Sequence, residues 1–197
     1  MRGNLDCLHF PLTGYPSCDI QEWERIFRIY KSYGLNHVRF HSWCPPEAAF
    51  TAADRIGIYI QAEVLWIDWW MSVVSKERPE MTTRGLPKGL GHNPSADKFV
   101  PEELQRMIEA YGNHPSFTML CIGNELGNSN FDIMQQWIKS LQEKDPRRLY
   151  AISTARKIMP ADQYMVTHNI PQTGGTYGIN GLSLIHISEP TRLGMIS

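Results

Sequence analysis

The chain has 197 residues, of which 42% are hydrophobic and 20% charged, a composition typical of folded globular domains that excludes disordered and fibrous classes. Its formal net charge of −1 provides no basic surface for nucleic acid or an anionic membrane, and no stretch holds the roughly 18 to 20 apolar residues needed to span a bilayer. We therefore expect one globular domain with a neutral partner, and neither nucleic acid nor a membrane.

Short β-type runs alternate with helical patterns along the chain. The first helix is marked by Asp19 with Glu22 three residues later, which is a capping-box spacing, and by Gly34 as its stop. Strands are expected at residues 5–10, 37–41, 58–65, 117–122, 149–153 and 164–168, and further helices at 47–55, 101–111 and 131–143. Residues 68–98 form a long stretch containing Gly, Pro and Trp, which is typical of a functional loop.

Repeated βα units indicate a parallel sheet, either an open doubly wound sheet or most of a (β/α)8 TIM barrel. The glycine signatures of nucleotide-binding open sheets are absent, since no GxGxxG follows the first strand and GLPKGLG at 85–91 lies within the long loop. The four cysteines lack the CxxC spacing of metal sites. We expect an α/β fold, an incomplete TIM barrel of about six βα units, with no cofactor and no metal.

The carboxyl ends of all strands of a parallel barrel meet at one rim, where such enzymes keep their active sites. The residues that close the expected strands are Asp6 or His9, Arg39, His41, Trp43, Glu63, Trp66, Asn124, Glu125, Ser153, Arg156, His168 and Asn169. Carboxylates, cations and aromatic planes together suit sugars, whose hydroxyls need directional hydrogen bonds and whose apolar ring faces stack on Trp. The rim therefore favours a carbohydrate partner, an oligo- or polysaccharide.

Three stretches resemble, in order and spacing, the catalytic barrels of family 2 glycoside hydrolases. They are RGN at 2–4, GLNHVRFHSWCPPEAAFTAADRIGIYIQAE at 34–63, and NHPSFTMLCIGNELGN at 113–128. The resemblance covers about residues 2–170. It implies a retaining glycosidase, with its acid/base carboxylate at the end of strand 4 and its nucleophilic carboxylate at the end of strand 7.

By this resemblance Glu125 is the catalytic acid/base, and Asn124 hydrogen-bonds the sugar hydroxyl next to the anomeric carbon. Arg39 and His41 would hold the carboxylates of the site and the sugar hydroxyls. The rim alone adds further substrate-binding candidates, namely Trp43, Glu63, Trp66 and His168. The chain departs from the family pattern after residue 170, where the strand with the nucleophile should follow.

Each candidate also has a purely structural interpretation. A Glu after an apolar strand can simply favour a helix start. Arg39 can form an ion pair inside the barrel mouth, Glu63 can pair with a neighbouring Arg, and His168 can be a hydrogen-bonded core residue. Trp66, Trp69 and Trp70 either stack on a sugar or pack the long loop onto the barrel.

Two other functions stay open. A non-catalytic carbohydrate-binding barrel would keep the aromatics and an Arg but would not need the Asn-Glu pair. A different TIM-barrel hydrolase, dependent on a metal, would need an HxH on the first strand, where only His9 is present.

The end of the chain departs from the βα pattern. Residues 182–192 read LSLIHISEPTR, which is letter for letter the in-frame translation of a transposase-type sequencing adapter. We therefore interpret residues 1–181 as a partial TIM-barrel glycoside hydrolase catalytic domain and residues 182–197 as read-through sequence without a domain. Because this domain stops before the nucleophile, we expect the chain by itself to be inactive.

Overall fold

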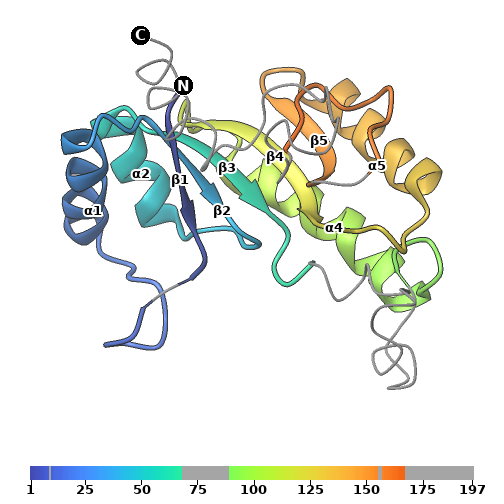
Figure 1. Cartoon of the computed structure of the whole chain (residues 1–197), viewed down its shortest axis with the longest axis horizontal. Coiled ribbons are helices and arrows are strands. Elements are labelled where there is room, and N and C mark those ends of the chain that lie inside the picture. The colour runs from blue at the N-terminus through green and yellow to red at the C-terminus, as the bar shows by residue number, and fades with distance from the viewer. Residues whose placement is uncertain (9, 68–88, 155–156, 167–197) are drawn as a thin grey trace, which may run out of the picture.

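A computed structural model describes residues 1–8, 10–67, 89–154 and 157–166, and the expected read-through segment lies outside them. Within these ranges a five-stranded parallel sheet has the order β1-β2-β3-β4-β5 (Figure 1). The strands are β1 (Gly3–Asp6), β2 (His37–Phe40), β3 (Tyr59–Glu63), β4 (Phe117–Asn124) and β5 (Leu149–Thr154), and the helices are α1 (Ile20–Ser32), α2 (Glu47–Ile56), α4 (Pro94–Tyr111) and α5 (Phe131–Lys144). Each strand pairs with its neighbours in the sequence, which is how consecutive units build a barrel wall.

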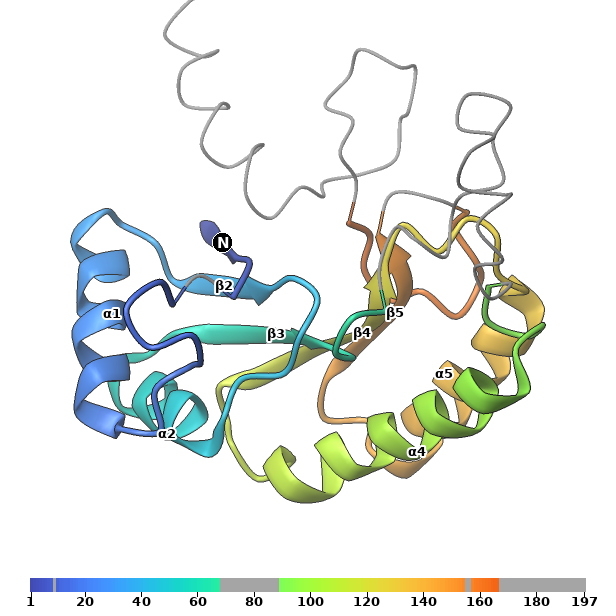
Figure 2. The same ribbon diagram turned by 90° about the horizontal axis from the view of Figure 1, so that it is seen from below.

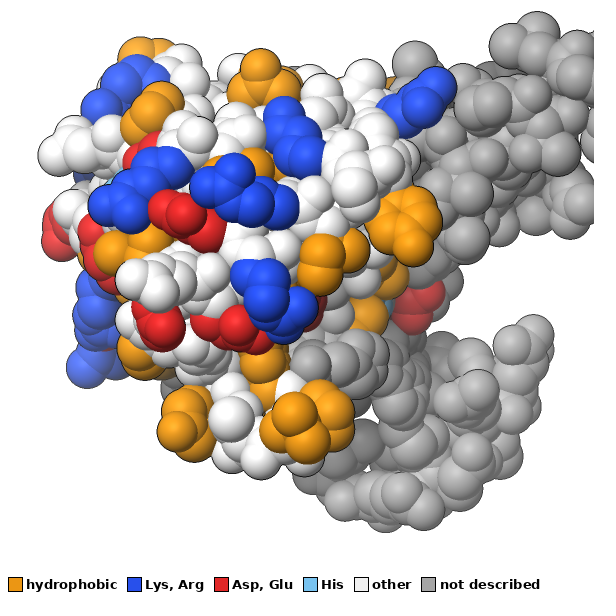
Figure 3. All heavy atoms as spheres, turned by 90° about the vertical axis from the view of Figure 1, so that its left-hand side faces the viewer, with side chains coloured by type: hydrophobic (Ala, Val, Ile, Leu, Met, Phe, Trp, Pro, Cys, Tyr) orange, Lys and Arg blue, Asp and Glu red, His pale blue; other side chains and the backbone are white. Residues whose placement is uncertain are grey.

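The helices lie along the outer side of the curved sheet, α1 and α2 beside the first strands and α4 and α5 beside β4 and β5 (Figures 1 and 2). The core fills the space between helices and sheet, with Trp23, Phe27, Phe50, Leu104 and Ile138 fully buried. The face over α1 and α2 carries interspersed basic and acidic side chains (Figure 3). This division into an apolar inner side and a mixed-charge outer side matches helices that cover a barrel from outside.

At the start of the first helix, one predicted contact is confirmed and the other is wrong. Asp19 caps α1, because its carboxylate accepts a hydrogen bond from Gln21 N at 2.9 Å. The capping box is wrong: Glu22 pairs with Arg25 at 2.6 Å, and the N–H of Asp19 donates to Ser17 Oγ at 3.0 Å. The spacing of Asp19 and Glu22 alone did not show which partner the second carboxylate takes.

The largest differences from the expected elements concern β1, α4 and the sixth strand. β1 ends at Asp6 rather than residue 10, because Asp6 Oδ1 accepts a hydrogen bond from Leu8 N at 3.0 Å and Leu8 turns the chain with a φ of 62°. α4 begins at Pro94, not 101, since Asn93 caps it and proline suits the first helical turn. The sixth expected strand, 164–168, is not a strand over its described residues 164–166, and its remainder lies outside the described residues.

The outer edge of β5 is hydrogen-bonded by the segment that follows it. Tyr150 N donates to Gln163 Oε1 at 3.0 Å, and Gln163 N donates to Tyr150 O at 2.9 Å. Farther along the strand, Ile152 N donates to Asp162 Oδ1 at 2.7 Å. Two side chains therefore occupy backbone positions that a neighbouring strand would otherwise take.

Asp145 ties together the amino ends of β4 and β5. Its carboxylate accepts hydrogen bonds at 2.8 Å from Arg147 Nε, Arg147 Nη2 and Arg148 Nη2. Arg148 also donates to Gly112 O at 3.0 Å and lies over the Phe117 ring, 4.4 Å from its centroid. The hydrogen bonds from Arg147 lower the pKa of the Asp145 carboxyl below its ordinary value of 3.8.

We expect Asp145→Asn to destabilise the fold at neutral pH, by about 3–5 kcal/mol, because Arg148 then stays buried without its counter-charge. Folding lowers the pKa of Asp145, so its ionised form stabilises the fold above 3.8, and this contribution is lost as the pH falls through the lowered value. Urea unfolding of both proteins between pH 7 and acid should therefore show the difference in unfolding free energy shrinking as pH falls. A difference that is the same at every pH would contradict this account.

Candidate active site

The carboxyl ends of β2, β3 and β4 share one buried polar network. Arg39 donates from Nε to Glu63 Oε1 at 2.6 Å and from Nη2 to Glu63 Oε2 at 3.3 Å. The same Nη2 donates to Asn124 Oδ1 at 3.0 Å. Three strands thus contribute one charge, one counter-charge and one amide, and these side chains are 4%, 0% and 3% exposed, respectively.

Two further side chains donate hydrogen bonds to the carboxylate of Glu63. Ser42 Oγ donates to Glu63 Oε2 at 2.7 Å, and Gln61 Nε2 donates to Glu63 Oε1 at 3.1 Å. Burial lowers the pKa of Arg39, but the charge and hydrogen bonds of Glu63 outweigh it and raise that pKa above its ordinary value. Arg39 therefore keeps its charge in the barrel interior and Glu63 is its partner.

The chain turns sharply where β4 ends, at the Asn124-Glu125 pair. Asn124 N donates to Ile67 O at 2.9 Å, and a side chain on Gly123 would meet that same oxygen at 2.0 Å, so only glycine fits there. Glu125 has a φ of 55°, in the left-handed region that few non-glycine residues adopt. Leu126 N then donates to Ser153 Oγ on β5 at 3.0 Å. These contacts fix a half-buried carboxylate at the rim.

The other predicted site residues lie in different surroundings. His41 is half-buried at the end of β2, and its Nδ1 lies 3.9 Å from Cys7 Sγ. Trp66 follows β3 and is 68% exposed, and its backbone N–H donates to Ser42 O at 3.1 Å. His168 lies outside the described residues.

The indole of Trp43 is buried and is not exposed at the rim as expected. Its indole is 2% exposed and packs edge-on against Phe40, with ring centroids 4.8 Å apart, while its Nε1 donates to Asp6 O at 3.1 Å. The reason is local: β2 ends at Phe40, so the alternation of faces along a strand no longer applies three residues later. Trp43 is a core residue with a satisfied indole N–H.

Three residues of this region were not singled out from the sequence. Ser42 and Gln61 are donors to Glu63, and only their distances to its carboxylate reveal them. The hydroxyl of Tyr164 is buried without a hydrogen-bond partner among the described residues. Burial, and then the nearby Cys121 and Glu63, raise the pKa of Tyr164 well above its usual value. Nothing in the sequence around Tyr164 indicates that its hydroxyl is buried near Glu63 and Cys121.

The Asn-His-Pro-Ser run lies at the opposite, amino end of β4. His114 Nδ1 contacts Asp54 Oδ2 at 2.6 Å, and its Nε2 contacts Glu47 Oε1 at 3.0 Å. Asp54 also accepts a hydrogen bond from Ser116 N at 2.9 Å. This run fastens α2 to the start of β4, so its part is structural and remote from the rim.

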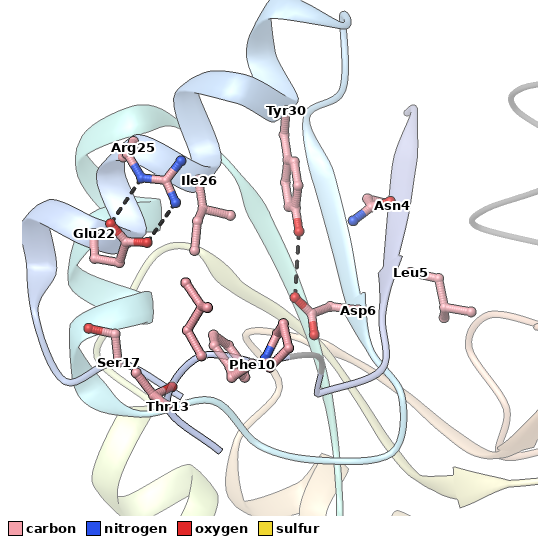
Figure 4. Close-up of a pocket in the computed structure, with 12 residues that line it drawn as sticks. Asn4, Leu5, Asp6, Phe10, Thr13, Ser17, Glu22, Arg25, Ile26 and Tyr30 are labelled. Carbon is pink, nitrogen blue, oxygen red and sulfur yellow. Dashed lines mark hydrogen bonds and ion pairs between the residues drawn. The ribbon is translucent and has the colours of Figure 1, made fainter. Parts of the chain in front are cut away.

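No metal cluster or membrane helix occurs within the described ranges. Those residues include no group of three or more His, Cys, Asp or Glu placed to hold a metal ion. Among the same residues no helix is long and apolar enough to cross a membrane. A pocket of about 550 Å³ is lined by β1, the loop after it and α1, with Asp6, Phe10 and Tyr30 on its wall (Figure 4). It lies between β1 and α1, away from the Arg39–Glu63–Asn124 network.

We expect Glu63→Gln to lower the unfolding free energy by about 3–5 kcal/mol, because it leaves Arg39 charged and buried without a counter-charge. Glu102→Gln is the matched control, since Glu102 pairs with Arg106 on the surface, and such exposed pairs contribute under about 1 kcal/mol. Denaturant melts of the two variants measure the difference. The double variant Arg39→Met with Glu63→Leu removes both charges and should recover part of the lost unfolding free energy. If Glu63→Gln and the wild type have the same unfolding free energy, this role of Glu63 is refuted.

Comparison with known proteins gives the same assignment for the barrel. The model of glycosyl hydrolases family 2, TIM barrel domain, matches residues 15–169. A β-galactosidase of Leuconostoc mesenteroides subsp. mesenteroides is 27% identical over 123 residues, which cover 60% of this chain and 10% of that protein. The chain therefore spans a small part of the length of this relative.

Solved structures share the fold. A β-glucuronidase of Parabacteroides merdae superposes with a TM-score of 0.58 at 22% identity, over 77% of this chain and 18% of that one. A glycosyl hydrolase family 2 member of Bacteroides cellulosilyticus superposes with a TM-score of 0.60 at 22% identity, over 81% of this chain and 19% of that one. The expected incomplete α/β TIM barrel is thus confirmed, and with most of its length matched by the family model, this chain belongs to glycosyl hydrolase family 2.

Proposed function

We propose that this chain carries the acid/base half of a retaining glycosidase site, in which Glu125 protonates the departing glycosidic oxygen of a carbohydrate. The observation that carries the proposal is the Asn124-Glu125 pair at the carboxyl end of β4, held by side chains from β2 and β3. In parallel barrels this end of the strands holds the catalytic groups. Membership of family 2 adds that the reaction is the cleavage of a glycosidic bond.

The hydrogen bond from Arg39 orients the amide of Asn124. Because Oδ1 accepts from Arg39 Nη2, the Nδ2 donors lie on the opposite side of the amide. We assign these donors to the sugar hydroxyl next to the anomeric carbon, where a hydrogen bond strengthens as the oxocarbenium-like transition state forms. Arg39 and Glu63, both buried, then act by positioning Asn124 rather than by touching the sugar.

Around this pair, two exposed or half-exposed groups are the candidates for direct sugar contact. Trp66 presents a 68% exposed indole beyond β3, and an aromatic plane stacks on the apolar face of a sugar ring. His41 is half-buried at the end of β2 and offers a ring nitrogen to a hydroxyl. His168 stays a candidate from the sequence.

The retaining mechanism needs a second carboxylate about 5 to 5.5 Å from the first, which attacks the anomeric carbon while Glu125 donates its proton. Glu125 afterwards deprotonates the water that hydrolyses the glycosyl-enzyme. We propose that this nucleophile belongs to a part of the barrel beyond residue 181, and that residues 182–197 are read-through sequence. The chain alone then lacks the attacking group, so the glycosidic bond is not cleaved and no covalent intermediate forms.

The test compares this chain with a complete barrel, made by extending the coding sequence past residue 181 in the source DNA. Aryl β-galactosides and β-glucuronides are the first substrates, because the relatives above carry those names. We expect turnover only with the complete barrel. Hydrolysis by this chain alone would refute the placement of the nucleophile.

In the complete barrel, Glu125→Gln should lower kcat for substrates with poor leaving groups by about 10²- to 10⁴-fold, the usual contribution of a general acid. Substrates with good leaving groups need little protonation, so their first step should be less affected. Glu143→Gln, an exposed carboxylate on α5, is the control and should leave kcat unchanged. If Glu125→Gln hydrolyses poor-leaving-group substrates at the wild-type rate, Glu125 is not the acid. If this chain and the complete barrel both bind sugar but neither hydrolyses it, the result supports a carbohydrate-binding barrel instead.

A further inference from the structure

The four cysteines of the chain lie in four different environments. Cys121 is fully buried on β4 and Cys44 is half-buried beyond β2, and burial raises the pKa of both thiols. Cys18 is exposed, and its sulfur has no partner among the residues that the structure describes. Cys7 is half-buried, and its Sγ lies 3.9 Å from His41 Nδ1. Among the cysteines and their neighbours that the structure describes, Cys7 is the one whose sulfur lies beside an imidazole.

The Cys7–His41 contact is built by the sheet. Cys7 directly follows β1 and His41 directly follows β2, and the two strands pair in parallel with Asp6 beside Phe40. His41 is held at its backbone, because its N–H donates to Asp6 O at 2.8 Å. The thiol and the imidazole therefore meet at the carboxyl ends of neighbouring strands, on the rim that also carries Glu125.

A thiol beside an imidazole is chemically different from a solvated thiol. The thiolate is the nucleophile, and a neighbouring His favours it by taking the proton and by the positive charge that results. Surface exposure alone would make Cys18 the faster thiol. The relative reactivity of Cys7 and Cys18 thus separates the effect of the imidazole from that of access.

We propose that Cys7 and His41 form a reactive thiol site on the rim, which takes soft carbon electrophiles such as haloacetamides. Cys7 transfers its S–H proton to His41 Nδ1, and the thiolate attacks the methylene carbon of the reagent. A C–S bond forms, the carbon–iodine bond of iodoacetamide breaks, and iodide leaves with the bonding electron pair. The imidazolium then releases its proton to water.

The site has a consequence that rests on the proposed function. Cys7 and Glu125 share one rim, with three strand spacings of about 4.8 Å between β1 and β4. A group attached to Cys7 adds bulk beside His41, which is one of the candidates for direct sugar contact. Alkylation of Cys7 should raise KM of the complete barrel, and the Cys7→Ser variant should lose this sensitivity.

The reactivity itself is tested on this chain, without any glycosidase assay. The folded protein is treated with excess iodoacetamide at pH 7, quenched at intervals and digested, and mass spectrometry gives the alkylated fraction of each cysteine. We expect Cys7 to react about tenfold faster than Cys18, and the two rates to become similar in denaturant. His41→Asn should slow Cys7 about tenfold and leave Cys18, measured in the same tube, unchanged.

The outcomes are distinct. A Cys7 rate at or below that of Cys18 in the folded wild type overturns the proposal, as does a fast Cys7 that His41→Asn does not slow. Should His41→Asn fail to fold, His41→Gln and the wild-type comparison with Cys18 still decide. Because no step requires turnover of a glycoside, failure here leaves the assignment of Glu125 untouched, and an inactive complete barrel leaves the thiol result standing.

Discussion

The ion pair between Arg39 and Glu63 is the interaction on which the rest of the rim depends. A guanidinium and a carboxylate that are 4% and 0% exposed are stable only if their hydrogen-bonding groups are satisfied. Ser42 and Gln61 supply donors to the carboxylate, and Asn124 supplies an acceptor to the guanidinium. Each of these comes from a position fixed by the pairing of β2, β3 and β4. The position of Asn124 therefore depends on the register of the sheet.

The amino and carboxyl ends of the strands differ in their interactions and in their backbone conformations. At the amino ends, Asp145 and His114 each contact charged side chains and so join helices to strands. These contacts lie at the end of the strands opposite the rim. At the carboxyl ends the backbone adopts costly conformations, with Glu125 in the left-handed region and Gly123 against Ile67 O. Buried ion pairs therefore occur at both ends of the strands, whereas the left-handed backbone of Glu125 lies at the carboxyl end, where the candidate catalytic side chains are presented. This is the division expected of parallel barrels.

The sequence predicted the parallel βα order and the placing of Arg39, Glu63 and Asn124 at neighbouring strand ends, because strand ends in a parallel sheet follow from the alternation of apolar runs. It failed where the answer depends on geometry between elements. The burial of Trp43 was missed because it depends on packing against Phe40 and on a hydrogen bond to Asp6 O of another strand. The role of Ser42 likewise follows only from its distance to Glu63. The start of α4 was missed because Pro101 is a common helix start, whereas here it lies inside the helix.

The spatial order of the strands equals their order along the chain. Each of the strands β2 to β5 therefore pairs with the strand that precedes it in the chain, and these pairings need no distant segment. After β5, the side chains of Asp162 and Gln163 occupy the open edge of the growing sheet. With these two hydrogen bonds, Tyr150 N and Ile152 N are not available for pairing with a strand of another chain.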